Sequence, residues 1–256
     1  MRLVLFEIFG FKVYSYGLLI AIGIISASYL FISRTKKKGY DEDKIFNLII
    51  IAVISGILGG KLLFIITELK HIINNPKILL DFGNGFVIYG AILLGGLSIY
   101  IYCKKNKWDV LDILDCVVPG LALAQGFGRI GCFLAGCCYG AETTSKFGVQ
   151  FPVDSLAPSG VYLLPTQLYS SAFDFALAGV LLWYSRKSRN KGYVFSVYVI
   201  LYSIGRFIVE FLRNDPRGSV GFLSTSQFIA IFTLILGISV FIIQKSKGRE
   251  KNIEEN

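Results

Sequence analysis

The sequence predicts an all-α, polytopic membrane protein with about seven transmembrane helices. Three observations support this fold class. Hydrophobic residues make up 54% of the 256 positions, charged residues only 17%, and the mean hydropathy is +0.62. Several apolar runs are about 20 residues long, which is the length a helix needs to cross a hydrocarbon core of about 30 Å. The charged residues are clustered between these runs, where water can solvate them.

Each predicted span is an apolar run bounded by polar or charged segments. The spans cover residues 13–33, 45–66, 86–103, 110–128, 166–184, 193–212 and 224–244. Small residues within them, such as Gly56 and Gly60, allow close helix packing in lipid. We expect one integral membrane domain over residues 1–256, with 138–165 as an extracytoplasmic cap and 245–256 as a cytoplasmic tail.

The basic residues predict how the chain is oriented. Of the 26 Lys and Arg residues, sixteen lie in the tail and in the loops after the first, third and fifth spans. Seven lie at the N-terminus and in the alternate loops. Because Lys and Arg are enriched on the cytoplasmic side, we expect the N-terminus outside and the C-terminus in the cytoplasm. This distribution accounts for the net charge of +9, so no nucleic-acid partner is expected.

Polar side chains are predicted to meet near the outer ends of the spans, where burial makes each a functional candidate. They are Tyr16, Lys61, Tyr89, Arg129, Gln167, Tyr169, Arg206, Glu210 and Arg213. The spacing of Arg206, Glu210 and Arg213 places them on one helix face, where an ion pair could serve packing alone. Four cations against one carboxylate nevertheless favour an anionic ligand, and guanidinium groups suit the phosphate of a membrane lipid.

Cys132, Cys137 and Cys138 lie close in the sequence, and three roles are considered for them. The first is a metal site. Their spacing differs from the paired C-x₂-C units of zinc sites, and the chain's one histidine, His71, lies in another segment. We therefore predict no metal and no other cofactor. A disulfide on the oxidising outer side is the second alternative, and packing as small apolar side chains is the third.

Six short motifs occur along most of the chain, over about residues 10–244. They are 16-YGL-18, 59-GGK-61, 128-GRIGCF-133, 165-PTQLY-169, 206-RFIVEFLR-213 and 223-LSTSQ-227. Their order and spacing resemble the phosphatidylglycerol–prolipoprotein diacylglyceryl transferases. The resemblance implies a multi-pass enzyme of the bacterial cell membrane whose active site faces the outer leaflet. Its substrates would be phosphatidylglycerol and the lipobox of a prolipoprotein signal peptide, and glycerol phosphate would be released.

On this basis we expect catalytic roles for Arg129, Arg206, Glu210 and Tyr89. The arginines would stabilise negative charge that develops on the phosphate, and Glu210 would orient an arginine. The remaining candidates would bind substrate: they are Tyr16, Lys61, Cys132, Cys137, Gln167, Tyr169 and Arg213.

The chain departs from the family pattern at several polar positions. Tyr89 stands where the family usually has histidine, and Cys132, Ala135 and Cys137 replace two asparagines and a glutamate. A tyrosine is a poorer base because it ordinarily titrates near pH 10. Two alternatives therefore stay open. One is a related lipid transferase with another acceptor or with Cys132 or Cys137 as a covalent nucleophile, and the other is a non-catalytic phospholipid-binding or transport protein.

Overall fold

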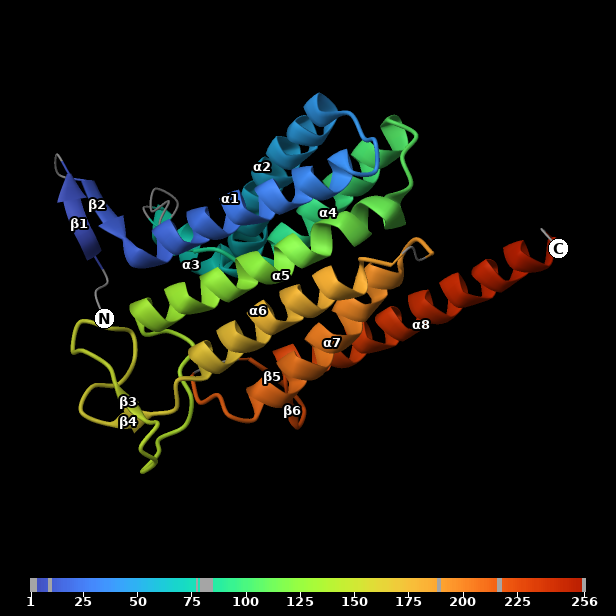
Figure 1. The fold of residues 1–256 in the computed structure, drawn as a ribbon. Helices are drawn as coiled ribbons and strands as arrows, with labels where there is room; N and C mark the ends of the chain where they lie inside the picture. Colours follow the sequence, from blue (N-terminus) through green and yellow to red (C-terminus); the bar gives the residue numbers. More distant parts are fainter. Residues whose placement is uncertain are drawn as a thin grey trace. The chain divides into compact units, whose positions relative to one another are not determined.

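The computed structural model describes residues 4–8, 11–76, 78, 85–187, 190–215 and 218–254. Four basic residues used to predict the orientation lie outside these ranges: Arg2, Lys77, Arg189 and Arg217. Within them the chain is mostly helical, with eight helices and three two-stranded antiparallel sheets (Figure 1). The predicted fold class is confirmed in this coarse sense.

Seven long helices match the seven predicted spans, one helix to each span. They are α1 (Ser15–Lys36), α2 (Glu42–Thr67), α4 (Ile88–Lys105), α5 (Val110–Ala135), α6 (Thr166–Tyr184), α7 (Tyr193–Glu210) and α8 (Thr225–Glu254). The short helix α3 (Leu69–Asn74) follows α2. Local capping explains some of the boundaries. The side chain of Asp41, for example, accepts a hydrogen bond from the Lys44 backbone N–H at 3.0 Å and so begins α2.

Five of these helices are long and apolar enough to cross a membrane: α1, α2, α5, α7 and α8. The other two are less apolar. Helix α4 ends with Lys104 and Lys105, and α6 buries Gln167, Ser171 and Asp174. The chain therefore has several helices that can span a membrane, while the count of seven spans and their orientation stay predictions.

The three sheets are small hairpins between or before helices. The first pairs β1 (Val4–Ile8) with β2 (Phe11–Tyr14), the second β3 (Val149–Gln150) with β4 (Tyr162–Leu163), and the third β5 (Ser219–Val220) with β6 (Leu223–Ser224). The second hairpin lies in the predicted cap segment 138–165, where Phe151, Ala157 and Leu163 form a small buried cluster. This segment thus has its own apolar core, although nothing in its sequence periodicity indicated one.

The chain divides into two compact units. One consists of Met1–Phe31 and Leu114–Asn256, and the other of Ile32–Ile113. We call them the large unit and the small unit and describe each separately. The prediction of a single integral membrane domain stays a prediction.

In the small unit, α2 packs closely against α4 at two glycines. A Cβ atom added to Gly59 would lie 2.3 Å from the backbone oxygen of Gly90, and one added to Gly90 would lie 2.2 Å from that of Gly59. Gly56 was named from the sequence together with Gly60. A Cβ atom added to Gly56 would lie 3.8 Å from the backbone oxygen of Ala91, which is an ordinary contact distance. The close approach of the helices therefore depends on Gly59 and Gly90, because any side chain there would separate the two backbones.

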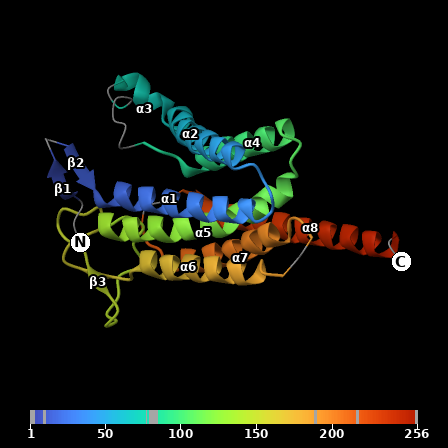
Figure 2. The same ribbon diagram turned by 45° about the horizontal axis from the view of Figure 1, so that its top comes forward.

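In the large unit, α5, α6, α7 and α8 run alongside one another, with the first part of α1 beside α5 (Figures 1 and 2). Buried polar groups link neighbouring helices. The Ser171 hydroxyl of α6 donates to the Gly126 carbonyl of α5 at 2.9 Å, and the Ser203 and Thr233 hydroxyls join α7 to α8 at 2.7 Å. Such bonds satisfy hydroxyl groups that lipid cannot solvate.

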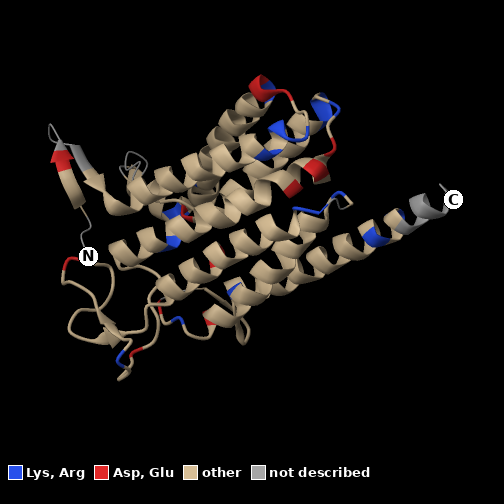
Figure 3. Ribbon diagram, in the orientation of Figure 1, with Lys and Arg blue, Asp and Glu red and all other residues tan. Residues whose placement is uncertain are grey.

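Basic residues gather at one end of the large unit. The Asn190 side chain donates to the Gln244 carbonyl at 3.5 Å, which places the α6–α7 turn beside the C-terminal part of α8. Figure 3 shows Lys and Arg in both segments. The C-terminal end of α7, with Arg206, is at the opposite end of the unit.

A buried carboxylate from α5 begins helix α7. Asp115 is only 5% exposed, and its two oxygens accept hydrogen bonds from the backbone N–H groups of Gly192 and Phe195, each at 2.7 Å. Gly192, the residue before α7, has no side chain with which to cap the helix. Asp115 supplies this cap, and its charge also complements the positive end of the helix dipole.

Replacing Asp115 should destabilise the protein. We expect Asp115→Ala to cost about 2 kcal/mol, because two charge-assisted hydrogen bonds to buried N–H groups are lost. Asp115→Asn, which keeps one acceptor oxygen, should fall between Asp115→Ala and the wild type. The thermal midpoint of the purified protein in detergent measures this order. Equal midpoints for Asp115→Ala and the wild type would contradict the capping role.

Candidate active site

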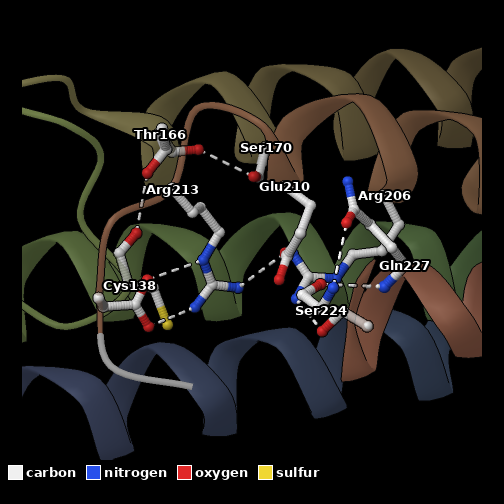
Figure 4. Close-up of polar contacts among 10 residues, drawn as sticks. Cys138, Thr166, Ser170, Arg206, Glu210, Arg213, Ser224 and Gln227 are labelled. Carbon is white, nitrogen blue, oxygen red and sulfur yellow. Dashed lines mark hydrogen bonds and ion pairs between the residues drawn. The ribbon is translucent and has the colours of Figure 1, made fainter. Parts of the chain in front are cut away.

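The centre of the candidate site is a carboxylate between two arginines at the C-terminal end of α7. An oxygen of Glu210 lies 2.9 Å from a terminal nitrogen of Arg206 and 3.8 Å from one of Arg213. Figure 4 shows the Glu210 side chain between the two guanidinium groups. The Glu210 side chain is 1% exposed, so its charge is stabilised by the arginines and not by water. Helix α7 ends at Glu210, two residues before the predicted end at 212.

Arg213 is held in place by its side chain and its backbone. Its guanidinium group donates two hydrogen bonds to the Asp215 carboxylate, at 3.0 and 2.7 Å. Its backbone pairs with Gly140 in an isolated antiparallel bridge, next to a hydrogen bond from the Asn214 N–H to the Tyr139 carbonyl at 3.2 Å. Asp215 was not selected from the sequence, because nothing in the spacing R-N-D shows which way the chain turns after a helix.

Arg206 is oriented by the beginning of α8. Its second terminal nitrogen donates to the Ser226 hydroxyl at 2.8 Å. Ser224 and Gln227 cap this helix reciprocally: the Gln227 side chain accepts from the Ser224 N–H and the Ser224 hydroxyl accepts from the Gln227 N–H, both at 3.1 Å. The motif 223-LSTSQ-227 is therefore a capping box that fixes Ser226 beside the arginine.

Arg129, on α5, is the one arginine of the candidate site that has no direct carboxylate partner among the described residues. In the part of the chain that the structure describes, its side chain forms no ion pair, although it is close enough to Asp174 and Cys138 to interact electrostatically. Asp174, on α6, is 3% exposed and also interacts with Arg206. Asp174 was not selected from the sequence, because a lone aspartate in an apolar run belongs to no motif.

These carboxylates change the predicted charge balance. The expectation was four cations against one carboxylate, whereas the large unit places three arginines near Glu210, Asp215 and Asp174. The predicted formal excess of positive charge is therefore wrong for this unit. The site is distinguished instead by the unequal pairing of its arginines, since Arg206 and Arg213 have direct carboxylate partners and Arg129 has none among the described residues.

A sharp turn after α5 brings three thiols together. The Sγ atoms of Cys132, Cys137 and Cys138 all lie within 4.8 Å of one another. The turn needs a left-handed backbone at Gly136, with φ of 76°, and at Cys138, with φ of 62°. Side chains of α6 hold it. The Gln167 amide donates to the Cys137 carbonyl at 2.7 Å. The Thr166 hydroxyl donates to the Cys138 carbonyl at 2.8 Å (Figure 4).

The thiols and arginines influence one another's ionisation. Hydrogen bonds with the Cys132 and Cys137 thiols, together with the charges of Arg213 and Arg129, lower the pKa of Cys138 well below the usual range of a thiol. The neighbouring Cys132 and Cys138 thiols raise the pKa of Cys137. The positive charges of Arg213 and Arg129 thus favour the thiolate form of Cys138.

The other predicted site residues of the large unit are Tyr16, Gln167 and Tyr169, and they differ in whether they lie near the arginines and thiols. Tyr16, in the first turn of α1, has its ring against Gly131, near Arg129 and the three thiols. Gln167 is 1% exposed, and its side-chain oxygen has no hydrogen-bond partner among the described residues. Tyr169, two residues along the same helix, is 39% exposed and points to the other side of α6. The structure thus brings Tyr16 and Gln167 to the arginines and thiols but not Tyr169.

Lys61 and Tyr89 belong to the small unit. They are the sequence neighbours of Gly60 and Gly90, so both lie beside the closest contact of α2 with α4. The Lys61 ammonium group is 5.4 Å from the centre of the Phe64 ring. Both residues are half-buried, at the end of these two helices away from the basic residues Lys44 and Lys104.

Comparison with known proteins gives a consistent family assignment. The family model described as prolipoprotein diacylglyceryl transferase matches residues 3–243. The phosphatidylglycerol–prolipoprotein diacylglyceryl transferase 2 of Clostridium perfringens is 64% identical over all 256 residues of both chains. That of Clostridium tetani is 63% identical over 96% of this chain and 98% of its own. The transferase 1 of Clostridium perfringens is 35% identical over 98% of this chain and 97% of its own.

Removing the charge of Glu210 should destabilise the site strongly. We expect Glu210→Gln to cost about 3 kcal/mol, because two buried arginines lose their shared carboxylate. Glu42→Gln, which breaks the exposed pair with Lys36, is the matched control and should leave the thermal midpoint unchanged. Midpoints of the two variants in detergent, each compared with the wild type, provide the measurement. A loss no larger in Glu210→Gln than in Glu42→Gln would show that the buried pair adds no stability.

Proposed function

Because the chain belongs to the prolipoprotein diacylglyceryl transferase family, we propose that it transfers a diacylglyceryl group from phosphatidylglycerol to a prolipoprotein. The acceptor is the thiol of the lipobox cysteine in the signal peptide, and glycerol phosphate is the second product. One observation supports this most directly. Arg129 lies near Arg206 without a carboxylate partner of its own in the described residues, so its guanidinium group is free to bind a substrate phosphate.

The reaction moves negative charge from sulfur to phosphate oxygen. The acceptor thiolate attacks the glycerol carbon that carries the phosphate, a C–S bond forms, and the C–O bond to the phosphate breaks. Charge then develops on the departing phosphate, where fixed cations lower the barrier. Arg129 and Arg206 are the proposed catalytic cations. Glu210 and Ser226 hold Arg206 at 2.9 and 2.8 Å, so little reorganisation is needed when the charge appears.

The substrate pocket is proposed to surround these arginines. Tyr16 and the free amide oxygen of Gln167 would bind the glycerol head group, and Arg213 would complete the anion site. Cys132 and Cys137 would form its wall in the turn after α5. Tyr169, on the exposed side of α6, would contact acyl chains or the signal peptide.

Lys61 and Tyr89 are proposed from their motifs. Lys61 stands where the family motif Gly-Ala-Arg has arginine, and it would assist in binding the head group. Tyr89 stands where the family usually has histidine, and it would bind the acceptor thiol by a hydrogen bond. Because a phenol is a weak base at neutral pH, another group or ion is needed to help convert the acceptor thiol to its thiolate.

The membrane arrangement proposed for this activity has seven spans with the N-terminus outside. The basic residues at one end of the large unit support it, because that end would be cytoplasmic. The active site would then face the outer leaflet, beneath the segment 138–165 as an extracytoplasmic cap. This is the side on which an exported prolipoprotein presents its lipobox.

Transfer in vitro tests the proposal. Purified protein is given phosphatidylglycerol with a labelled diacylglycerol moiety and a lipobox peptide, and both lipidated peptide and released glycerol phosphate are measured. We expect Arg129→Ala to lower kcat/KM about 100- to 1,000-fold, because one charge-stabilising donor is lost. Arg186→Ala, which removes a charge at the basic end, is the matched control and should retain full activity.

Other results would contradict the proposal in different ways. Lipid binding without turnover in the wild type would indicate a phospholipid-binding protein. Label attached to the enzyme during turnover, and absent in Cys132→Ser or Cys137→Ser, would indicate a covalent intermediate in place of direct transfer.

A further inference from the structure

The three thiols of the turn after α5 have the geometry of a metal site. Their Sγ atoms lie within 4.8 Å of one another. Tetrahedral zinc with Zn–S bonds of about 2.3 Å requires sulfur–sulfur separations of about 3.8 Å, which small side-chain rotations would reach. The C-x₄-C-C spacing gave no indication of this. Adjacent cysteines in an extended chain point apart, whereas the left-handed backbone at Cys138 turns its thiol toward the other two.

The turn is fixed before any ion binds. Gln167 and Thr166 hold the carbonyls of Cys137 and Cys138, and the Cys137 N–H donates to the Cys132 carbonyl at 3.1 Å. Cys132 is 9% exposed, and the other two cysteines are half-buried. Ligands held this firmly lose little entropy on binding a metal, and the partial exposure leaves room for an ion to enter.

The cluster offers three sulfur ligands, and the number of protein ligands distinguishes catalytic from structural zinc sites. No imidazole or carboxylate of the described residues joins the group. Zinc sites that serve structure usually have four protein ligands, whereas those that serve chemistry have three and leave a fourth position for substrate or water. Soft thiolates select zinc over the hard cations magnesium and calcium.

We propose that Cys132, Cys137 and Cys138 bind a zinc ion whose fourth position receives the lipobox cysteine as a thiolate. The inference rests on the proposed function, since it identifies how the acceptor of that reaction is activated. A thiol that coordinates zinc loses its proton, so the nucleophile forms without a strong protein base. Zinc would therefore favour loss of the proton from the acceptor thiol, which Tyr89, as a weak base, would not do.

The chemical step balances without an oxidant or reductant. The acceptor thiol transfers its proton to water when its sulfur binds zinc. The zinc-bound sulfur then forms the C–S bond with the glycerol carbon, and the C–O bond to phosphate breaks. Glycerol phosphate leaves with the bonding electrons, and the thioether, a weaker ligand than a thiolate, dissociates from the ion.

The neighbouring charges suit such a complex. Zinc held by three thiolates is a net anion, and the acceptor thiolate makes it more negative. Arg129 and Arg213 both interact electrostatically with Cys138. The same arginines would therefore stabilise the metal complex and attract the substrate phosphate to the adjacent position, which places nucleophile and leaving group side by side.

Metal binding is tested first on the whole chain in detergent, kept reduced, stripped with a chelator and reconstituted with zinc sulfate. We expect one zinc per chain in the wild type and in Cys103→Ala, whose buried cysteine lies outside the cluster. Cys132→Ser, Cys137→Ser and Cys138→Ser should each weaken binding by more than the roughly 10- to 100-fold that loss of an outer-shell partner costs. Equal zinc content in the wild type and in all three variants overturns the proposal.

Cobalt(II) in place of zinc tests the fourth position. Lipobox peptide should add a thiolate-to-cobalt charge-transfer band and shift the visible d–d bands, whereas the same peptide with serine at the acceptor position should not. A response identical for both peptides overturns the role of the fourth position. Near-isosteric Cys→Ser changes and the thermal midpoint of each variant show whether the fold is retained.

Transfer activity separates this inference from the proposed function. We expect the metal-free protein to be inactive and zinc to restore it, with Tyr89→Phe still binding one zinc per chain. Transfer at the wild-type rate by metal-free protein overturns the zinc proposal and leaves the proposed function intact. Zinc binding and the cobalt response to the peptide, without any transfer, support the metal site and contradict the function.

Discussion

The buried carboxylate of Glu210 is the interaction on which the candidate site depends. At 1% exposure it has almost no water to solvate it, so its stability rests on Arg206 and Arg213. The requirement is mutual for Arg206, which pairs with Glu210 at 2.9 Å, whereas Arg213 also pairs with Asp215 at 2.7 Å. This pairing links the end of α7 to the residues that begin α8 and to the loop that carries Asp215. Three consecutive segments of the chain thereby acquire one common geometry.

Arg129 differs from Arg206 and Arg213, because each of those two arginines binds a carboxylate directly. Asp215 binds Arg213 with two hydrogen bonds, and Ser226 and Glu210 bind Arg206. Among the described residues Arg129 has longer-range partners only, an arrangement that an anionic ligand would complete. A family that acts on an anionic lipid provides that ligand. The same principle explains Asp115, whose burial is compensated by the N-terminal N–H groups of α7.

In the proposed mechanism, the positions at which the motifs of this chain differ from the family pattern are those near the acceptor thiol. Tyrosine replaces the usual histidine, and cysteines replace polar residues near Arg129. Taken singly, these substitutions would weaken the proposed site, because tyrosine is a poorer base than histidine and a thiol is a poorer hydrogen-bonding group than an amide or a carboxylate. In the folded chain, however, Cys132, Cys137 and Cys138 lie together. The zinc ion that we propose they bind would deprotonate the acceptor thiol in place of a histidine. On the zinc proposal, the cysteines and the missing histidine are two aspects of one change in mechanism.

The sequence by itself determined which segments form helices, because apolar runs of membrane length have no other way to satisfy their backbone groups. It also identified Arg129, Arg206 and Glu210, since a charge in an apolar run stands out in one dimension. It could not identify Asp174 or Ser226 beside these arginines, because the packing of separate helices brings them together. Nor could it identify Asp215 as the partner of Arg213, because the spacing does not show how the chain turns after α7. Nor could it show that the thiols of Cys132, Cys137 and Cys138 converge. Their spacing indicated no metal site, and only the left-handed turn held by α6 decided that the three sulfur atoms share one point in space.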